Sequence, residues 1–456
     1  MLRSFYIIIL ILCASEVLPQ LPNKNTYLIG NVNSYPGYAG LWGYVSPAGN
    51  EYALLGCING TSIVDITDSS NIHEIEFIPG LNSIYREIKT YSHYAYVVSE
   101  ATNSKLQILD LQYLPDSVTL VSTFVYPGFT RAHNISQSGP FLYLSGGNVC
   151  PNGGVQILEL LNPELPIVRG FNSVRYVHDS RIKNDTIWTA NILNQKVSVI
   201  NANDKDNPNE IRSFSSLEPM PHNIAISTDR RFLFLTHENQ DPPGSLEIWN
   251  IEDLENVTFV RNWLPTGITS SVTHNIEIYD SIAVIAHYTA GVRILNISDP
   301  VNPVEIAWYD TRPQDNDNIF QGCWGVFKFP SGKIIASDIS NGLFVLRVDI
   351  PTNISNNINT PVNYSLAQNF PNPFNPVTNL EFGISNLGFV TLKVYDLLGK
   401  EVTTLVNKKL NPGNYKVEFD GSGYSSGVYF YRLVVSSSNP LNTKEFTVTK
   451  RMMLLK

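Results

Sequence analysis

The sequence repeats a segment whose starting points lie 44 to 52 residues apart. Residues 273–300 show the unit clearly, as three runs of alternating apolar and polar residues separated by turn residues: THNIEIYDSIAVIAHYTAGVRILNISDP. Seven units begin at these positions: Trp42, Arg86, His133, His178, His222, His274 and Trp324. The repeat constrains the fold strongly, because each unit can bury its apolar face only against a neighbour.

Each unit contains four short runs with strand character, and a turn rich in Asp, Asn and Pro precedes the fourth, as in NISDPVNPVEIAWY. The two-residue alternation and the absence of helix caps exclude an α-solenoid. Four antiparallel strands at this period are typical of a propeller blade. The last unit ends at Asp349 after three strands, and residues 26–32, TYLIGNV, are predicted to supply its fourth. We therefore expect an all-β, seven-bladed β-propeller over residues 21–350, closed by an N-terminal strand.

The first residues, MLRSFYIIILILCASEV, have the proportions of a secretory signal peptide, with one basic residue, a short apolar run and then small residues. We expect residues 1–20 to be removed on export. No later segment is long and apolar enough for a transmembrane helix. The net charge of −9 argues against a nucleic-acid partner. Three cysteines remain after cleavage, and their odd number leaves at least one thiol unpaired: Cys57, Cys150 and Cys323.

Ordered motifs in the repeats resemble those of known propellers. TSIVDITD and VRILNISDPVNPVEI resemble the LVIVD repeat. A closer resemblance, to the choice-of-anchor B family, covers about residues 27–350 and rests on these stretches: LWGYVSPAGNEYALLG, YREIKTYSHYAYVVSEA, YVHDSRIKNDTIWTANI, AHYTAGVRILNISDPVNPVEI and SGKIIASDISNGLFVL. That family is defined by its architecture and its varied C-terminal anchors. The resemblance implies no particular activity.

The C-terminal part of the chain predicts a separate module. Residues 351–363, PTNISNNINTPVN, lack apolar periodicity and are typical of a linker. Residues 364–456 contain several alternating strands with Gly and Asn turns, which predicts a small Ig-like β-sandwich. The motifs NFPNPFNPVT, LKVYDLLGKEV, SSGVYFYRL and KRMMLLK resemble the type A C-terminal sorting domain of the type IX secretion system. The resemblance implies the secretion machinery as a partner, export across the outer membrane, and removal of the tail with attachment to a surface glycolipid or release.

Four successive units begin with a histidine. In a propeller, the first strand of each blade lines the central channel, and its start shares a face with the end of the second strand. The metal-ligand candidates are therefore His133, His178, His222 and His274, with His237 and His287 nearby at the ends of second strands. A two-residue turn at Asp280-Ser281 would pair Tyr279 with Ile282 and, in the same register, His274 with His287. The same alignment predicts these supporting or ligand-binding residues at the mouth: Arg86, Glu87, Glu100, Asp179, Asp338, Trp42 and Trp324.

Three interpretations of this histidine ring remain open. Converging neutral imidazoles suit a transition metal ion, namely Fe, Cu, Zn or Ni, with carboxylates orienting their second nitrogens. A polar funnel for a small molecule, glycan or protein ligand needs no metal. Structural bracing predicts hydrogen bonds within each histidine's own blade. The function predicted is an exported ligand-binding or interaction module, and the alternative is a metal-dependent oxidoreductase or hydrolase with a multi-His site on the axis.

Overall fold

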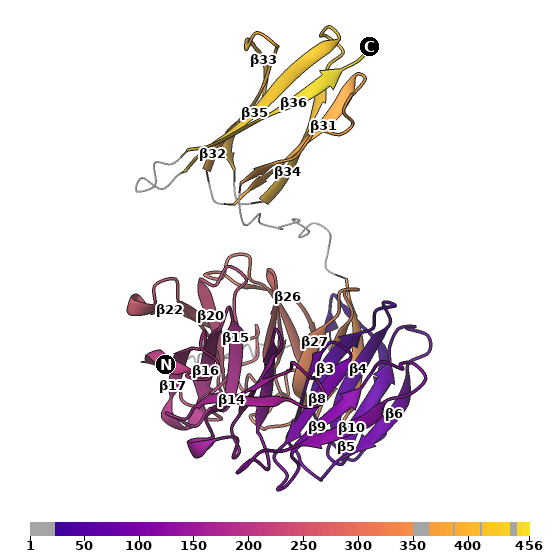
Figure 1. The fold of residues 1–456 in the computed structure, drawn as a ribbon, viewed down its shortest axis with the longest axis vertical. Helices are drawn as coiled ribbons and strands as arrows, with labels where there is room; N and C mark the ends of the chain where they lie inside the picture. The colour runs from indigo at the N-terminus through magenta and orange to yellow at the C-terminus, as the bar shows by residue number, and fades with distance from the viewer. Residues whose placement is uncertain (1–22, 350–363, 386–387, 411–412, 438–444) are drawn as a thin grey trace, which may run out of the picture.

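The computed structural model describes residues 23–349, 364–385, 388–410, 413–437 and 445–456. The predicted signal peptide, residues 1–20, and the predicted linker, residues 351–363, lie outside these residues. Strands dominate the described chain (Figure 1). Its helical elements are three single 3₁₀ turns: η1 (Pro151–Gly153), η2 (Ile192–Asn194) and η3 (Leu254–Asn256). No helix in the described part is long and apolar enough to cross a membrane.

The described residues before 350 form seven antiparallel sheets, and in the first five the strands are hydrogen-bonded in chain order. The first two sheets contain β3 (Tyr38–Val45), β4 (Glu51–Cys57), β5 (Gly60–Asp65) and β6 (His73–Pro79), then β7 (Arg86–Tyr91), β8 (Tyr94–Ser99), β9 (Leu106–Asp110) and β10 (Thr119–Phe124). The third and fourth contain β11 (Asn134–Ser138), β12 (Phe141–Ser145), β13 (Val155–Glu159) and β14 (Ile167–Asn172), then β15 (Asp179–Lys183), β16 (Thr186–Asn191), β17 (Lys196–Asn201) and β18 (Asn209–Ser215). The fifth contains β19 (Pro221–Ile226), β20 (Phe232–His237), β21 (Leu246–Asn250) and β22 (Thr258–Trp263).

The last two sheets of this region also take strands from the N-terminus. The sixth contains β23 (Ile276–Tyr279), β24 (Ile282–Ala286), β25 (Val292–Asn296) and β26 (Val304–Tyr309), with β1 (Asn23–Lys24) on its edge. The seventh contains β27 (Cys323–Lys328), β28 (Ile334–Asp338), β29 (Gly342–Val348) and β2 (Thr26–Val32). Because β2 pairs with β29 from Thr26 opposite Val348, the prediction that residues 26–32 complete the last unit is confirmed.

The sheets pack against one another in a closed cycle. Each pair of successive sheets shares a buried apolar cluster, as Leu54 of β4 and Val97 of β8 do. The seventh sheet packs against the first in the same way, through Val345 and Leu55 among others. The first strand of each sheet contacts the first strands of both neighbours. The starts of these inner strands are therefore brought around one axis.

The predicted hairpin turn is also present. Tyr279 pairs with Ile282, which confirms the two-residue turn. Asp280 adopts the left-handed conformation with φ of 53° that such a tight turn requires. The paired positions end with Ile276 opposite Ile285. The backbone N–H of His274 then donates to the carbonyl of Ala286, and that of His287 donates to Gly291, so the predicted pairing of His274 with His287 is wrong.

Residues after 363 form two further sheets around a core of their own. One contains β30 (Ser365–Leu366), β31 (Val377–Ile384) and β34 (Gly413–Asp420), and the other β33 (Glu401–Leu410), β32 (Gly388–Tyr395), β35 (Gly427–Ser437) and β36 (Glu445–Leu454). Leu380 and Phe419 of the first sheet belong to the same buried cluster as Leu392 and Leu433 of the second. Two sheets that bury their facing sides in a shared core form a sandwich.

Candidate functional site

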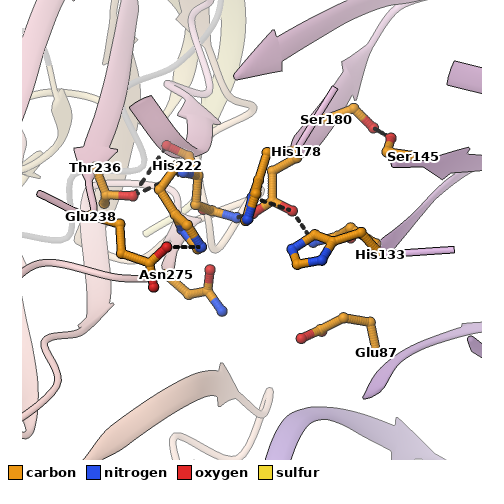
Figure 2. A network of polar contacts seen from close by, with 12 residues as sticks. Glu87, His133, Ser145, His178, Ser180, His222, Thr236, Glu238 and Asn275 are labelled. Carbon is orange, nitrogen blue, oxygen red and sulfur yellow. Dashed lines mark hydrogen bonds and ion pairs between the residues drawn. The ribbon is translucent and has the colours of Figure 1, made fainter. Parts of the chain in front are cut away.

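The four histidines that begin successive units lie side by side. His133 and His178 precede β11 and β15, His222 is the second residue of β19, and His274 lies just before β23. Successive ring centroids are 3.9 Å apart for His133 and His178, 4.3 Å for His178 and His222, and 4.3 Å for His222 and His274. Figure 2 shows three of these rings gathered in one arc. The structure thus brings together all four predicted imidazoles, from four different sheets.

Each ring except that of His178 makes an Nδ1 hydrogen bond to a neighbouring sheet. Nδ1 of His222 lies 3.2 Å from the carbonyl oxygen of His274, and Nδ1 of His274 lies 2.5 Å from that of Trp324. Nδ1 of His133 lies 2.9 Å from Oε1 of Glu100 on the preceding sheet. Nδ1 of His178 is buried and has no hydrogen-bond partner among the described residues. These bonds cross between sheets, whereas the bracing interpretation predicted bonds within one sheet.

Glu238, the residue after β20, lies between two of the histidines. Its carboxylate oxygens are 3.6 Å from Nε2 of His222 and 3.9 Å from Nε2 of His274. The hydroxyl of Tyr288 donates a hydrogen bond of 2.5 Å to Oε1 of Glu238. Figure 2 shows the carboxylate pointing at His222. One carboxylate therefore faces two imidazole nitrogens without a normal hydrogen bond to either.

These side chains line a cavity of about 360 Å³. Besides the four imidazoles and Glu238, its wall contains Glu100, Tyr85, Tyr176 and Trp324. His178, His222 and His274 are buried, and His133 is half-buried. The volume falls within the range of small-molecule sites, and the wall combines aromatic faces with a few polar groups that converge.

The electrostatics divide the histidines into two kinds. Burial and the neighbouring imidazoles hold the pKa of His178 well below its usual value. Burial, together with the adjacent His222, does the same to the pKa of His274. Burial is also the largest single effect on His133, but the hydrogen bond with Glu100 and the negative charges of Asp179, Glu100 and Glu87 together outweigh it and raise the pKa of His133. The same hydrogen bond lowers the pKa of Glu100. His178 and His274 are therefore neutral at physiological pH, as metal ligands must be.

Within the part of the chain that the structure describes, two groups of side chains have ligand atoms close enough to share an ion. In each group the atoms lie within 4.8 Å of one another: His133, His178 and Asp179 in the first, and His178, His222 and Glu238 in the second. The oxygens of Asp179 already accept hydrogen bonds from the amides of Asn134 and Asn223, the latter at 2.6 Å. Asp179 thus holds two neighbouring asparagine side chains in place, and it is not among the residues that line the cavity. The second group fits a metal ion better.

Two other predicted residues lie beside the cavity. Trp324 packs against the ring of His274, with centroids 4.6 Å apart. Its Nε1 donates a hydrogen bond of 3.2 Å to Oε1 of Glu87. Glu87 lines a narrower pocket along the axis, where burial raises its pKa to about 7. Glu87 therefore contacts Trp324 from the axial pocket, and it is not among the residues that line the histidine cavity.

The predicted histidines at the ends of second strands do not line the cavity. Nδ1 of His237 lies 2.9 Å from the carbonyl oxygen of Pro219, and its Nε2 lies 3.4 Å from buried Glu247. His287, expected opposite His274, instead lies with Nδ1 3.1 Å from the hydroxyl of Ser271. Successive side chains of a strand point to opposite faces of the sheet. An error of one position in aligning the second strands therefore predicts the wrong face for the side chain at the strand end.

Three further predicted residues are also placed elsewhere. Trp42 lines the axial pocket, where Nζ of Lys89 lies 3.6 Å from its ring centroid. Asp338, the last residue of β28, accepts a hydrogen bond of 2.7 Å from the hydroxyl of Thr311, which lies just after β26. The side chain of Arg86 lies between the first and second sheets. The preceding residue, Tyr85, lines the histidine cavity instead.

Glu238, Tyr85, Tyr176 and Tyr288 are among the residues that the sequence prediction missed. A signal for Glu238 exists, since it follows a second strand ending in His237 just as Glu100 follows one ending in Ser99. Among the described residues, all three cysteines that remain after position 20 are free thiols, and no disulfide joins the ring.

Comparison with known proteins bears on the two parts of the chain differently. None of the curated proteins matches it. Among solved structures, the WD40 β-propeller domain of Doa1 matches with a TM-score of 0.51 and 10% identity, over 70% of this chain and 96% of that one. A candidate 6-phosphogluconolactonase from Bacteroides uniformis gives a TM-score of 0.48 and 12% identity, over 69% of this chain and 98% of that one. The first likeness shows a β-propeller-like fold and nothing about activity.

The tail matches a known family at the sequence level. Residues 368–448 match the family described as secretion system C-terminal sorting domain. These residues include the two-sheet sandwich described above except for β30 and most of β36, and they lie within the segment 364–456 predicted to carry the tag. The chain therefore carries a type IX C-terminal sorting domain, which directs it out of the cell to the outer surface or into the medium.

Proposed function

We propose that this chain is an exported seven-bladed β-propeller that binds a ligand in its histidine-lined cavity, at the cell surface or after release. The observation that carries the proposal is the convergence of four imidazoles, two carboxylates and three aromatic rings on one cavity of about 360 Å³. Seven sheets packed in a closed cycle support the blade number. A small molecule, a glycan or a protein loop each fits a cavity of this size and polarity.

The proposal includes a division of the chain into a signal peptide (1–20), a propeller (21–350), a linker (351–363) and a sorting domain (364–456). The choice-of-anchor B resemblance over residues 27–350 agrees with it, because that family combines an LVIVD-type propeller with varied C-terminal anchors. The tail would then be an Ig-like sandwich of type A, removed by the secretion machinery when the propeller is attached or released.

We further propose that the cavity holds a transition metal ion, with His178, His222 and Glu238 as ligands. A neutral imidazole that donates from Nδ1 carries a lone pair on Nε2. His274 is such a ring, and its Nε2 faces the carboxylate of Glu238 at 3.9 Å. Two acceptors that face each other in a buried site repel one another, and a metal ion bound beside Glu238 would relieve that repulsion. Fe, Cu, Zn and Ni all accept an imidazole and carboxylate donor set.

A metal-dependent enzyme, an oxidoreductase or a hydrolase, is the second candidate function. The grouping of His178, His222 and Glu238 favours it, because three protein ligands leave a metal ion open positions toward the cavity. A bound metal would supply Lewis-acid or redox chemistry there. The chain itself would supply Tyr288, which donates to Glu238, and the aromatic wall that excludes water.

Metal analysis of the purified full chain tests these proposals. Near-stoichiometric Fe, Cu, Zn or Ni is expected in the wild type, and it should be lost in His178→Ala. His73→Ala is the matched control, since His73 is exposed at the start of β6 in the first sheet and its loss should leave the metal content unchanged. A chain that neither contains nor takes up any of these metals contradicts the metal proposal and leaves the metal-free binding cavity. Turnover that disappears together with the metal favours the enzyme.

A further inference from the structure

A second cavity, of about 470 Å³, lies between the first two sheets, away from the four imidazoles. Its wall combines the end of β6 and the segment after it with β8 and the loop that follows β8. Arg86 and Lys105 are its charged lining residues, and no carboxylate lines it among the described residues. In a chain of net charge −9, a cavity with only positive charge is unexpected.

Arg86 is buried, with 2% of its surface exposed. Its Nε donates to the carbonyl of Cys57 at 3.0 Å, and one terminal nitrogen, Nη2, donates to the carbonyl of Leu81 at 2.7 Å. The other, Nη1, makes no hydrogen bond with any residue that the structure describes. A Cβ at Gly80 would lie 2.7 Å from Nη1, so the glycine leaves room for the guanidinium.

No carboxylate neutralises Arg86 in the described structure. The other fully buried arginine, Arg293, has Glu305 at 3.4 Å, and the half-buried Arg181 has Glu277 at 2.9 Å. Burial lowers the pKa of Arg86 to about 10, and the opposing effect comes from the Cys57 thiol and not from a carboxylate. A buried cation without a counter-charge is costly, because water is replaced only by neutral carbonyl groups.

A second polar group in the same wall also lacks a partner. Ser99 pairs with Arg86 across the β7–β8 ladder and is 1% exposed. Its hydroxyl makes no hydrogen bond with any described residue. Buried hydroxyl groups are normally satisfied, so the Ser99 hydroxyl remains available for a further hydrogen bond. Lys105 lines the same cavity from the loop after β8.

We propose that this cavity binds the anionic oxyacid group of a small molecule, a carboxylate, sulfate or phosphate, with Arg86 as its principal partner. The guanidinium supplies the charge and the free Nη1 donors, the Ser99 hydroxyl adds one hydrogen bond, and Lys105 adds a second charge. Charge-assisted hydrogen bonds of this kind are the stronger ones in proteins. The site is independent of the histidine cavity and of any metal there.

Calorimetric titration of the full chain with inorganic phosphate, sulfate and acetate tests the proposal and separates the three anion classes. Saturable binding of at least one anion is expected. Lys105→Ala should weaken it about threefold to tenfold, and Arg86→Lys by about tenfold or more, because lysine cannot reproduce the planar donor set. Ser99→Ala should weaken it by a smaller factor. His178→Ala is the control, and it should bind the same anion with unchanged affinity.

Lys105→Ala carries the test if Arg86→Lys does not fold, because Lys105 lies on a loop and makes no ion pair with a described residue. The proposal is overturned if none of the three anions binds saturably. It is equally overturned if the affinity in Lys105→Ala, and in Arg86→Lys where that variant folds, equals that of the wild type. Loss of anion binding in His178→Ala would assign the anion to the histidine cavity and would also contradict it.

Discussion

Replacing Glu238 by glutamine should stabilise the metal-free protein while weakening its affinity for metal. In the wild type, the Glu238 oxygens lie 3.6 Å from Nε2 of His222 and 3.9 Å from Nε2 of His274. Nδ1 of both rings is hydrogen-bonded to a backbone carbonyl, and this contact leaves the acceptor lone pair of the uncharged form of each ring on Nε2, facing the carboxylate. A glutamine amide would donate to one of them and still accept from Tyr288.

One additional buried hydrogen bond contributes about 1 kcal/mol. The free energy of unfolding of Glu238→Gln, measured in chelator, should therefore exceed that of the wild type by about that amount. In the presence of metal the order should reverse, because loss of an anionic ligand should weaken affinity by about tenfold or more. Thermal unfolding of both proteins, with chelator and with excess Zn²⁺, measures the two effects together.

A destabilised Glu238→Gln in chelator would refute the reasoning. It would mean that the imidazoles are protonated and form ion pairs with the carboxylate, so that no cation is needed between them. His73→Ala, measured in parallel, should show neither effect and so controls for the loss of an unrelated histidine side chain.

Three further predictions concern two ion pairs of the propeller and the C-terminal tail. Arg181→Met should destabilise the propeller by about 3–5 kcal/mol in thermal unfolding, because it leaves the largely buried Glu277 without its partner at 2.9 Å. The Arg181→Met, Glu277→Leu double variant should lose less stability than Arg181→Met alone. An equal loss of stability in the two variants would contradict the pairing. Glu100→Gln should lower stability by about 1 kcal/mol between roughly pH 4.5 and 6.5. The stability difference should disappear as the pH rises through the raised pKa of His133, because the imidazole then loses its charge. It should also disappear as the pH falls through the lowered pKa of Glu100, because the carboxylate is then protonated. A difference that is unchanged up to pH 9 would be inconsistent with the pair. Deletion of residues 364–456 should keep the protein inside the outer membrane in cell fractionation, and surface display of the truncated chain would show that the tail is dispensable.

The repeat predicted much of the fold because its signal is local. Two-residue alternation and turn chemistry determine where each strand runs, and the Asp280 turn allowed the pairing of Tyr279 with Ile282 to be predicted correctly. The closing role of residues 26–32 followed from counting, since the last unit lacked a strand. The C-terminal module was recognisable from its motifs, and the match over residues 368–448 supports that interpretation.

The candidate site was harder to predict, because side-chain direction at strand ends depends on one residue of register. The alignment selected His237 where the structure places the following residue, Glu238, in the cavity. It likewise selected Arg86, while the adjacent Tyr85 lines the cavity. The direction of Arg86 is decided by carbonyl groups of the neighbouring sheet, at Cys57 and in the segment that follows β6, and contacts of this kind leave no periodic signal in the sequence.

The pairing of β2 with β29 has a mechanical consequence for a protein held at a surface by its C-terminal end. A pull on that end enters the ring through β29, which residue 349 follows directly. Since β29 is hydrogen-bonded to β28 on one side and to β2 on the other, the load shears two ladders at once, whereas an outermost strand would be peeled away one hydrogen bond at a time. The N-terminal strand β2 thus adds a second ladder of hydrogen bonds to β29, the strand through which force on an anchored propeller would enter.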